Sequence, residues 1–174
     1  YTGSIRKAND LSRLIYAARI LQKNTTNRII FLIYGDGVER QPLERFCSEE
    51  AITNIMFKGK VEKKYIPYIL SRCDLAYEDM SQDDLLNYGL SKNKLFDYMA
   101  AGLPILSILV HRYSIEDTYN CSISAENDAP NSIAQAILKA YQSDLSEYRK
   151  NALFAASQFD YKVLTEKLIE IIER

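Results

Sequence analysis

The run RIIFLIY at residues 28–34, followed at once by Gly35-Asp36-Gly37, decides the fold of this chain. After Arg28 its residues are β-branched, aromatic or long and apolar, and the run is followed by Gly35 and Gly37. This pattern predicts a strand followed by a tight turn. Because the run is apolar at nearly every position, we expect a strand of a parallel sheet that is buried on both faces by helices.

Apolar runs and helical patterns alternate along the rest of the chain. Further short strands are expected at 54–57, 74–77, 104–110 and 120–124. Helical spacing of apolar residues predicts helices over 10–22, 39–49, 63–72 and 91–101, and three more after residue 130. The order predicts an α/β fold, a Rossmann-like, doubly wound parallel sheet flanked by helices.

Length and composition indicate one domain over residues 1–174. Hydrophobic residues make up 47% of the chain, and the net charge of −1 gives no general attraction to nucleic acid. Three separated cysteines are typical of reduced thiols in a cytoplasmic protein. The opening Tyr1–Ile5 is typical of the end of a first strand and its loop, so we expect a piece of a longer polypeptide.

Several known types of nucleotide and metal site are excluded because the chain lacks the residues that they require. Gly35 and Gly37 lack a third glycine, because Arg40 stands there, and no GxxxxGK[ST] loop occurs. A single histidine, His111, excludes His-rich metal sites and a convincing triad, although it follows an expected strand. These residues therefore support no nicotinamide-dinucleotide, P-loop or His-rich metal site.

The start of the helix at 91–101 is a candidate anion site. Ser91 suits the N-cap, and Lys92 and Lys94 fall in the first turn, where the helix dipole disfavours cations. A bound anion would reverse the sign of that interaction. Asp97 shares a face with Asn93 and Lys94, so its carboxylate could accept hydrogen bonds from ribose hydroxyls.

Charge placement alone supports a simpler interpretation of the helix start equally well. The lysines can be solvated, Asp97 can pair with Lys94, and the apolar residues of the helix can fill the core. The anion-site hypothesis also requires that no acid neutralise the cationic tip of the helix.

The run YGLSKNKLFDYMAAGLPIL at 88–106 resembles the donor-binding segment of glycosyltransferase family 4, of the bacterial polysaccharide-biosynthesis type. Over about 1–174 the chain resembles the C-terminal, donor-binding half of a GT-B fold enzyme. The resemblance implies that the 91–94 turn receives the diphosphate and that Asp97 contacts the ribose. It makes Lys94 and Asp97 the candidate catalytic residues.

Other segments support the resemblance. Tyr1–Ser4 resembles the Gly-rich loop that faces the diphosphate, and Phe57–Val61 resembles the F-x-G-x-V loop at the nucleobase. The implied substrate-binding residues are Gly3, Ser4, Arg6, Lys60, Val61, Ser91, Lys92, Asn93, Lys94 and Asp97. The family's first glutamate is missing, since Gly89 stands there. Glu78, Asp79, Asp83 and Asp84 are expected to form a solvated acidic loop, although any of them could substitute.

The resemblance implies retaining transfer from a nucleotide-diphosphate sugar, a UDP-sugar, to a growing polysaccharide or lipid-linked acceptor. It also implies that no metal and no cofactor are required. The acceptor would sit on an absent N-terminal domain, so this fragment alone should be inactive. The full-length enzyme would be cytoplasmic, with docking at the inner membrane left open. Two alternatives remain: a UDP-sugar 2-epimerase-like domain, which one histidine argues against, and a non-catalytic nucleotide-binding module. The stripe from Leu164 to Ile172 is expected to be core or to face the missing domain.

Overall fold

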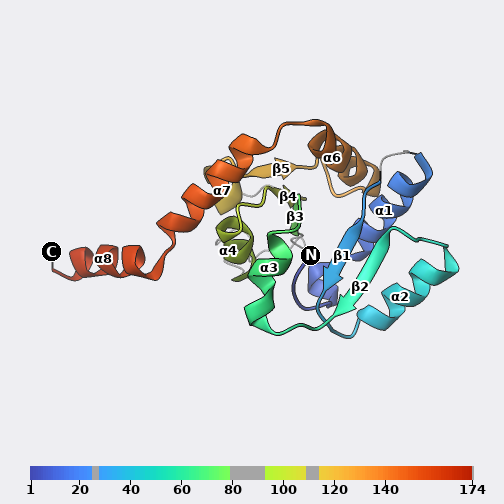
Figure 1. Ribbon diagram of the computed structural model, residues 1–174, viewed down its shortest axis with the longest axis horizontal. Coiled ribbons are helices and arrows are strands. Elements are labelled where there is room, and N and C mark those ends of the chain that lie inside the picture. The colour runs from blue at the N-terminus through green and yellow to red at the C-terminus, as the bar shows by residue number, and fades with distance from the viewer. Residues whose placement is uncertain (25–27, 79–92, 109–113, 174) are drawn as a thin grey trace.

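A computed structural model describes residues 1–24, 28–78, 93–108 and 114–173 (Figure 1). Each expected strand and helix forms close to its expected position, and the short η1 and α5 are additions. In chain order the elements are η1 (Lys7–Asn9), α1 (Ser12–Asn24), β1 (Phe31–Tyr34), α2 (Arg40–Glu49), β2 (Ile55–Gly59), η2 (Lys63–Tyr65), α3 (Ile66–Leu70), β3 (Ala76–Glu78), α4 (Asn93–Ala100), β4 (Ile105–Ser107), α5 (Ile115–Thr118), β5 (Ser122–Ser124), α6 (Pro130–Gln142), α7 (Ser146–Gln158) and α8 (Tyr161–Ile172).

The described strands form two parallel ladders. One has the order β1-β2, and the other has the order β3-β4-β5. Thr2 adds a single parallel bridge to Tyr34, so the N-terminal segment lies beside β1 as expected. The N-terminus lies between the two ladders (Figure 1). The parallel, Rossmann-like α/β class is therefore confirmed, with the sheet divided at the N-terminal segment.

Helices bury the strands on both sides, as the apolar runs predicted. One core cluster joins α1 and α6 to the centres of β1 and β4, through residues such as Leu14, Ile33 and Leu106. A second cluster packs α4 and α7 against β3 and β4, with Tyr98 and Met99 fully buried. Parallel strands buried in this way bring their carboxyl ends to one edge.

Backbone hydrogen bonds join the loops at this carboxyl edge. Gly3 N donates to the Tyr34 carbonyl, and Gly35 N donates to the Gly59 carbonyl, each at 2.9 Å. Gly35 has a φ of 145°, and a Cβ built there would lie 1.7 Å from the Gly3 carbonyl oxygen. Only glycine therefore allows the two loops to approach this closely.

Helix α8 differs from the other described α-helices because none of its residues is buried. It projects from the body of the domain beyond α7 (Figure 1). The expectation that its apolar stripe is core is wrong for this chain, since Leu168 is 55% exposed and Ile172 is 73% exposed. Within the described segments, no helix is both long and apolar enough to cross a bilayer.

Replacing Gly35 by Ala should lower the free energy of unfolding by about 3 kcal/mol, because the new methyl group overlaps backbone that cannot rotate away. Urea denaturation at 25 °C measures the change. Gly3→Ala is the matched control, since its φ of 150° is similar but its Cβ would meet only the Tyr1 side chain, at 3.0 Å. It should cost about 1 kcal/mol. Equal losses would contradict the steric account.

Candidate functional site at the start of helix α4

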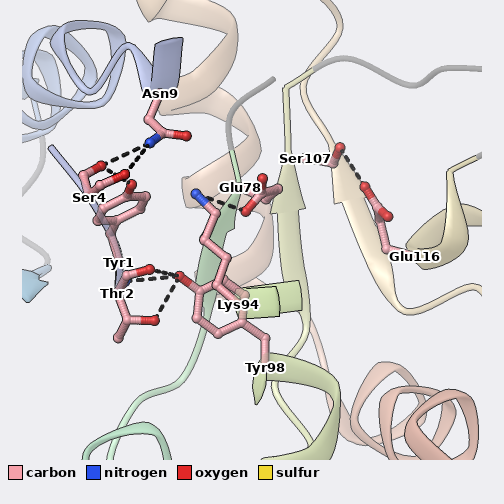
Figure 2. A network of polar contacts seen from close by, with 9 residues as sticks. All are labelled: Tyr1, Thr2, Ser4, Asn9, Glu78, Lys94, Tyr98, Ser107 and Glu116. Atoms are coloured by element: carbon pink, nitrogen blue, oxygen red, sulfur yellow. Dashed lines mark hydrogen bonds and ion pairs between the residues drawn. The ribbon is translucent and has the colours of Figure 1, made fainter. Parts of the chain in front are cut away.

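Lys94, in the first turn of α4, is the centre of the polar cluster at the carboxyl edge. Its Nζ lies 3.2 Å from a Glu78 carboxylate oxygen and 4.3 Å from the centroid of the Tyr1 ring. The ring contact is within the range of a cation–π interaction. Lys94 therefore joins α4, the end of β3 and the N-terminal loop (Figure 2).

Glu78 lies in a different place from the one that the sequence analysis expects. It was expected in a solvated acidic loop, but it is the last residue of β3 and its side chain is 2% exposed. It is buried because β3 continues one residue further than expected and pairs Glu78 with Ser107 of β4. One feature of the sequence could have indicated a buried Glu78, because it directly follows the apolar run at 75–77. A charge at the end of a buried strand needs a partner of opposite charge.

The ion pair corrects the electrostatic argument for the helix tip. The hypothesis required that no acid neutralise Lys94, and Glu78 does so. The alternative that Lys94 pairs with Asp97 is also wrong, because among the described residues its ion pair is with Glu78 and Asp97 forms none. Lys94 alone therefore does not demand an anionic ligand. The fold, the family and the convergence of loops at α4 are the features that support a donor site.

Tyr98 fixes the N-terminal loop to α4 one turn further along. Its hydroxyl oxygen accepts a hydrogen bond from Thr2 N at 2.9 Å and lies 3.3 Å from Thr2 Oγ1 (Figure 2). Burial raises the pKa of Tyr98, so the hydroxyl keeps its proton. Burial also lowers the pKa of the Tyr1 amino group, to about 6. The Thr2–Tyr98 contact is therefore a buried hydrogen bond between uncharged groups.

The predicted residues of the N-terminal loop lie at the rim of this cluster. Gly3, Ser4 and Arg6 are exposed. The Ser4 carbonyl accepts hydrogen bonds from the Tyr1 hydroxyl at 2.7 Å and from Asn9 Nδ2 at 2.9 Å (Figure 2). These bonds give the loop a defined shape while leaving the Arg6 side chain open to solvent.

The other predicted residues are distributed along the same edge. Asn93 is exposed and Asp97 is half-buried on α4, and within the described part of the chain Asp97 takes part in no ion pair. Lys60 and Val61 directly follow β2, but no described contact joins them to the Lys94 cluster. Ser91, Lys92 and His111 lie outside the described residues, as do the acids of the 79–84 segment.

A second buried acid lies beside the cluster. Glu116 is 2% exposed, and Ser107 Oγ donates to its Oε1 at 3.4 Å (Figure 2). Ser107 is the register partner of Glu78, so both acids lie against the end of β4. Among residues 1–24, 28–78, 93–108 and 114–173, no three His, Cys, Asp or Glu side chains gather in a way that could hold a metal ion.

Parallel ladders between helices, with a polar cluster at the carboxyl edge, define an α/β domain of the Rossmann-like type that forms half of GT-B glycosyltransferases. The family model described as "Glycosyl transferases group 1" matches residues 1–143. The chain belongs to that family. Comparison with curated protein sequences finds no match.

Solved structures share the fold. WaaG, a glycosyltransferase involved in lipopolysaccharide biosynthesis, is 21% identical with a TM-score of 0.70, over 98% of this chain and 45% of its own. The pneumococcal O-GlcNAc transferase GtfA, in complex with UDP and GlcNAc, is 23% identical with a TM-score of 0.73, over 97% of this chain and 33% of its own. Anabaena Alr3699/HepE in complex with UDP is 13% identical with a TM-score of 0.75, over 99% and 47%. This chain thus spans less than half the length of each.

Replacing Lys94 by Met should lower the free energy of unfolding by about 3 kcal/mol, because it leaves the Glu78 carboxylate buried without its cation. Adding Glu78→Gln should recover most of that loss, since the pair is then replaced by uncharged groups of similar size. Urea denaturation of the single and double variants measures both changes. Additive losses would show that the two side chains are not coupled.

Proposed function

We propose that this chain is the donor-binding half of a retaining glycosyltransferase and that it binds a nucleotide-diphosphate sugar, a UDP-sugar. Its family membership supports sugar transfer. Structures of the same fold were determined with UDP, as for Anabaena Alr3699/HepE, and with UDP and GlcNAc, as for GtfA. The transferred group is accordingly a hexosyl or N-acetylhexosaminyl unit, and the proposed reaction uses no metal.

The observation that carries the proposal is the convergence of three segments on Lys94 at the carboxyl edge. The first N–H groups of α4 have no acceptor within their own helix, so they can donate to a diphosphate. In this arrangement Ser91 to Lys94 hold the diphosphate from the helix side, and Gly3, Ser4 and Arg6 face it from the N-terminal loop. Asp97 accepts hydrogen bonds from the ribose, and Lys60 and Val61 lie at the base.

Glu78 gives the cation a fixed place in this scheme. Lys94 is 11% exposed, and its ammonium lies 3.2 Å from a Glu78 carboxylate oxygen and 4.3 Å from the centroid of the Tyr1 ring. A diphosphate bound at the start of α4 would bring a second anion to this ammonium. The charge that develops on the departing UDP would then be stabilised by a group that does not need to reorient. Lys94 would act in this way as the catalytic cation.

The acceptor and the remaining partners belong to the longer protein. The relatives of known structure are at least twice as long as the part that this chain covers. We place the acceptor, a growing polysaccharide or a lipid-linked glycan, on an N-terminal domain of a cytoplasmic enzyme. The exposed apolar stripe of α8 would pack against that domain. The 174-residue chain alone should bind the donor and transfer nothing.

Titration of the chain with UDP should shift the amide signals of residues 93–97 in NMR spectra, because the diphosphate binds at their N–H groups. In the Glu78→Gln background, adding Lys94→Met should weaken UDP binding by about tenfold, the value of one charge-assisted hydrogen bond. Uridine binding should change by less than about twofold, because the nucleoside carries no phosphate.

Two controls make this test specific. The Glu78→Gln background removes the buried carboxylate, so the comparison isolates the ammonium of Lys94. Lys139→Met, in the last turn of α6, removes an exposed cation outside the cluster and should leave UDP binding unchanged. The donor-site assignment is wrong if UDP, ADP and GDP all leave residues 93–97 unshifted at millimolar concentration, or if Lys94→Met weakens UDP and uridine equally.

A further inference from the structure

Arg40, the first residue of α2, lies at the carboxyl edge beside the end of β2. Its Nε donates to Glu44 Oε1 at 2.8 Å, and its Nη1 lies 3.9 Å from Asp36 Oδ1. A Cβ built on Gly59 would lie 3.3 Å from Nη1 and 3.9 Å from Cζ, so the guanidinium group lies against the last residue of β2. Contacts to two carboxylates and to the end of a strand therefore fix the position of this group.

Most of the N–H groups of Arg40 are left for a ligand. A guanidinium group has five N–H donors in a planar fork, and Glu44 accepts only the one on Nε. The distance from Nη1 to Asp36 is within ion-pair range but too long for a hydrogen bond. Within the described residues Nη1 and Nη2 donate no hydrogen bond, and the side chain is 28% exposed. Arg40 therefore presents fixed donors to solvent at this edge.

A row of loops connects this side chain with the start of α4. Gly3 N donates to the last residue of β1, and Gly35 N donates to the Gly59 carbonyl, so the N-terminal loop, the turn after β1 and the end of β2 are neighbours. About 10 Å, two strand spacings, separates the first of these segments from the last. A nucleotide with its diphosphate at the start of α4 can therefore extend along this row and place its base beside Gly59 and Lys60.

We propose that Arg40 selects uracil as the base of the donor, by donating a hydrogen bond to the carbonyl oxygen at position 4. This inference rests on the proposed donor function and adds a specificity-determining residue to it. Uracil and cytosine have nearly the same shape, but position 4 carries a carbonyl acceptor in uracil and an amino donor in cytosine. Arginine only donates and stays charged, so with cytosine it would lose the bond and face another donor.

NMR titrations of the chain with UDP, CDP and uridine measure this selectivity. The chain should bind UDP about tenfold more tightly than CDP, the effect of one hydrogen bond to a charged group. Arg40→Gln should reduce that preference to about twofold or less, because an amide can both donate and accept. It should weaken uridine and UDP by the same factor, since the lost contact is to the base.

Two further variants make the test specific. Arg45→Gln is the matched control, because Arg45 is an exposed arginine of the same helix that forms no ion pair among the described residues. It should leave the preference for UDP over CDP unchanged. Arg40→Lys keeps a cation beside Glu44 but loses the planar fork, so it should also reduce the preference. It provides a second measurement if Arg40→Gln unfolds.

Urea denaturation identifies the variants that remain folded. The proposal is overturned if a folded Arg40 variant keeps the preference for UDP, or weakens UDP and CDP equally. Equal weakening is the result of a purely structural role, in which Arg40 only supports the loop after Gly59. If the unmodified chain shows no UDP-induced shift at residues 93–97, the donor site itself is wrong, and this outcome is distinct from a donor site without uracil selection.

Discussion

The buried ion pair between Lys94 and Glu78 is the interaction on which the carboxyl edge of this domain depends. Glu78 ends a strand, Lys94 begins a helix, and the Tyr1 ring lies over the ammonium. A charge removed from water is tolerated only beside its counter-charge, so the pair sets how α4 sits on β3. The N-terminal loop then follows, because Tyr98 of the same helix holds Thr2. The need to pair a buried charge thus helps to position α4, the end of β3 and the N-terminal loop, which the strand ladders do not join to one another.

The same pair changes how the candidate donor site works. A solvated lysine at a helix start would attract any anion weakly, at a cost in side-chain freedom on binding. A lysine already held by Glu78 has lost that freedom during folding. In the proposed donor site, recognition would therefore depend on geometry and on the α4 N–H groups as well as on charge. Such an arrangement would suit a diphosphate, which could reach the ammonium and the helix start together.

The strands and helices could be predicted because their signals are local. The apolar run before Gly35, the glycine and proline after α4 and the helical periods of α6 and α7 each depend on neighbouring residues. The family resemblance of the segment around Lys94 also needed no structure, and the family match over residues 1–143 confirms it. The pairing of Lys94 with Glu78 was not predicted. The sequence is the same whether β3 ends before Glu78 or includes it, so it does not show whether Glu78 is exposed or buried.

By itself, the sequence determined the fold class, the family and the helix start at which a ligand is expected, since each follows from residue type and short-range spacing. Only the tertiary structure decided that Glu78 is buried against Lys94, that Tyr98 holds Thr2 across 96 residues, and that the stripe of α8 is exposed. The physical reason is the same for all three. Burial and pairing between distant segments arise only when the chain packs. The type of a residue, apolar or charged, does not determine which distant segment will pack against it.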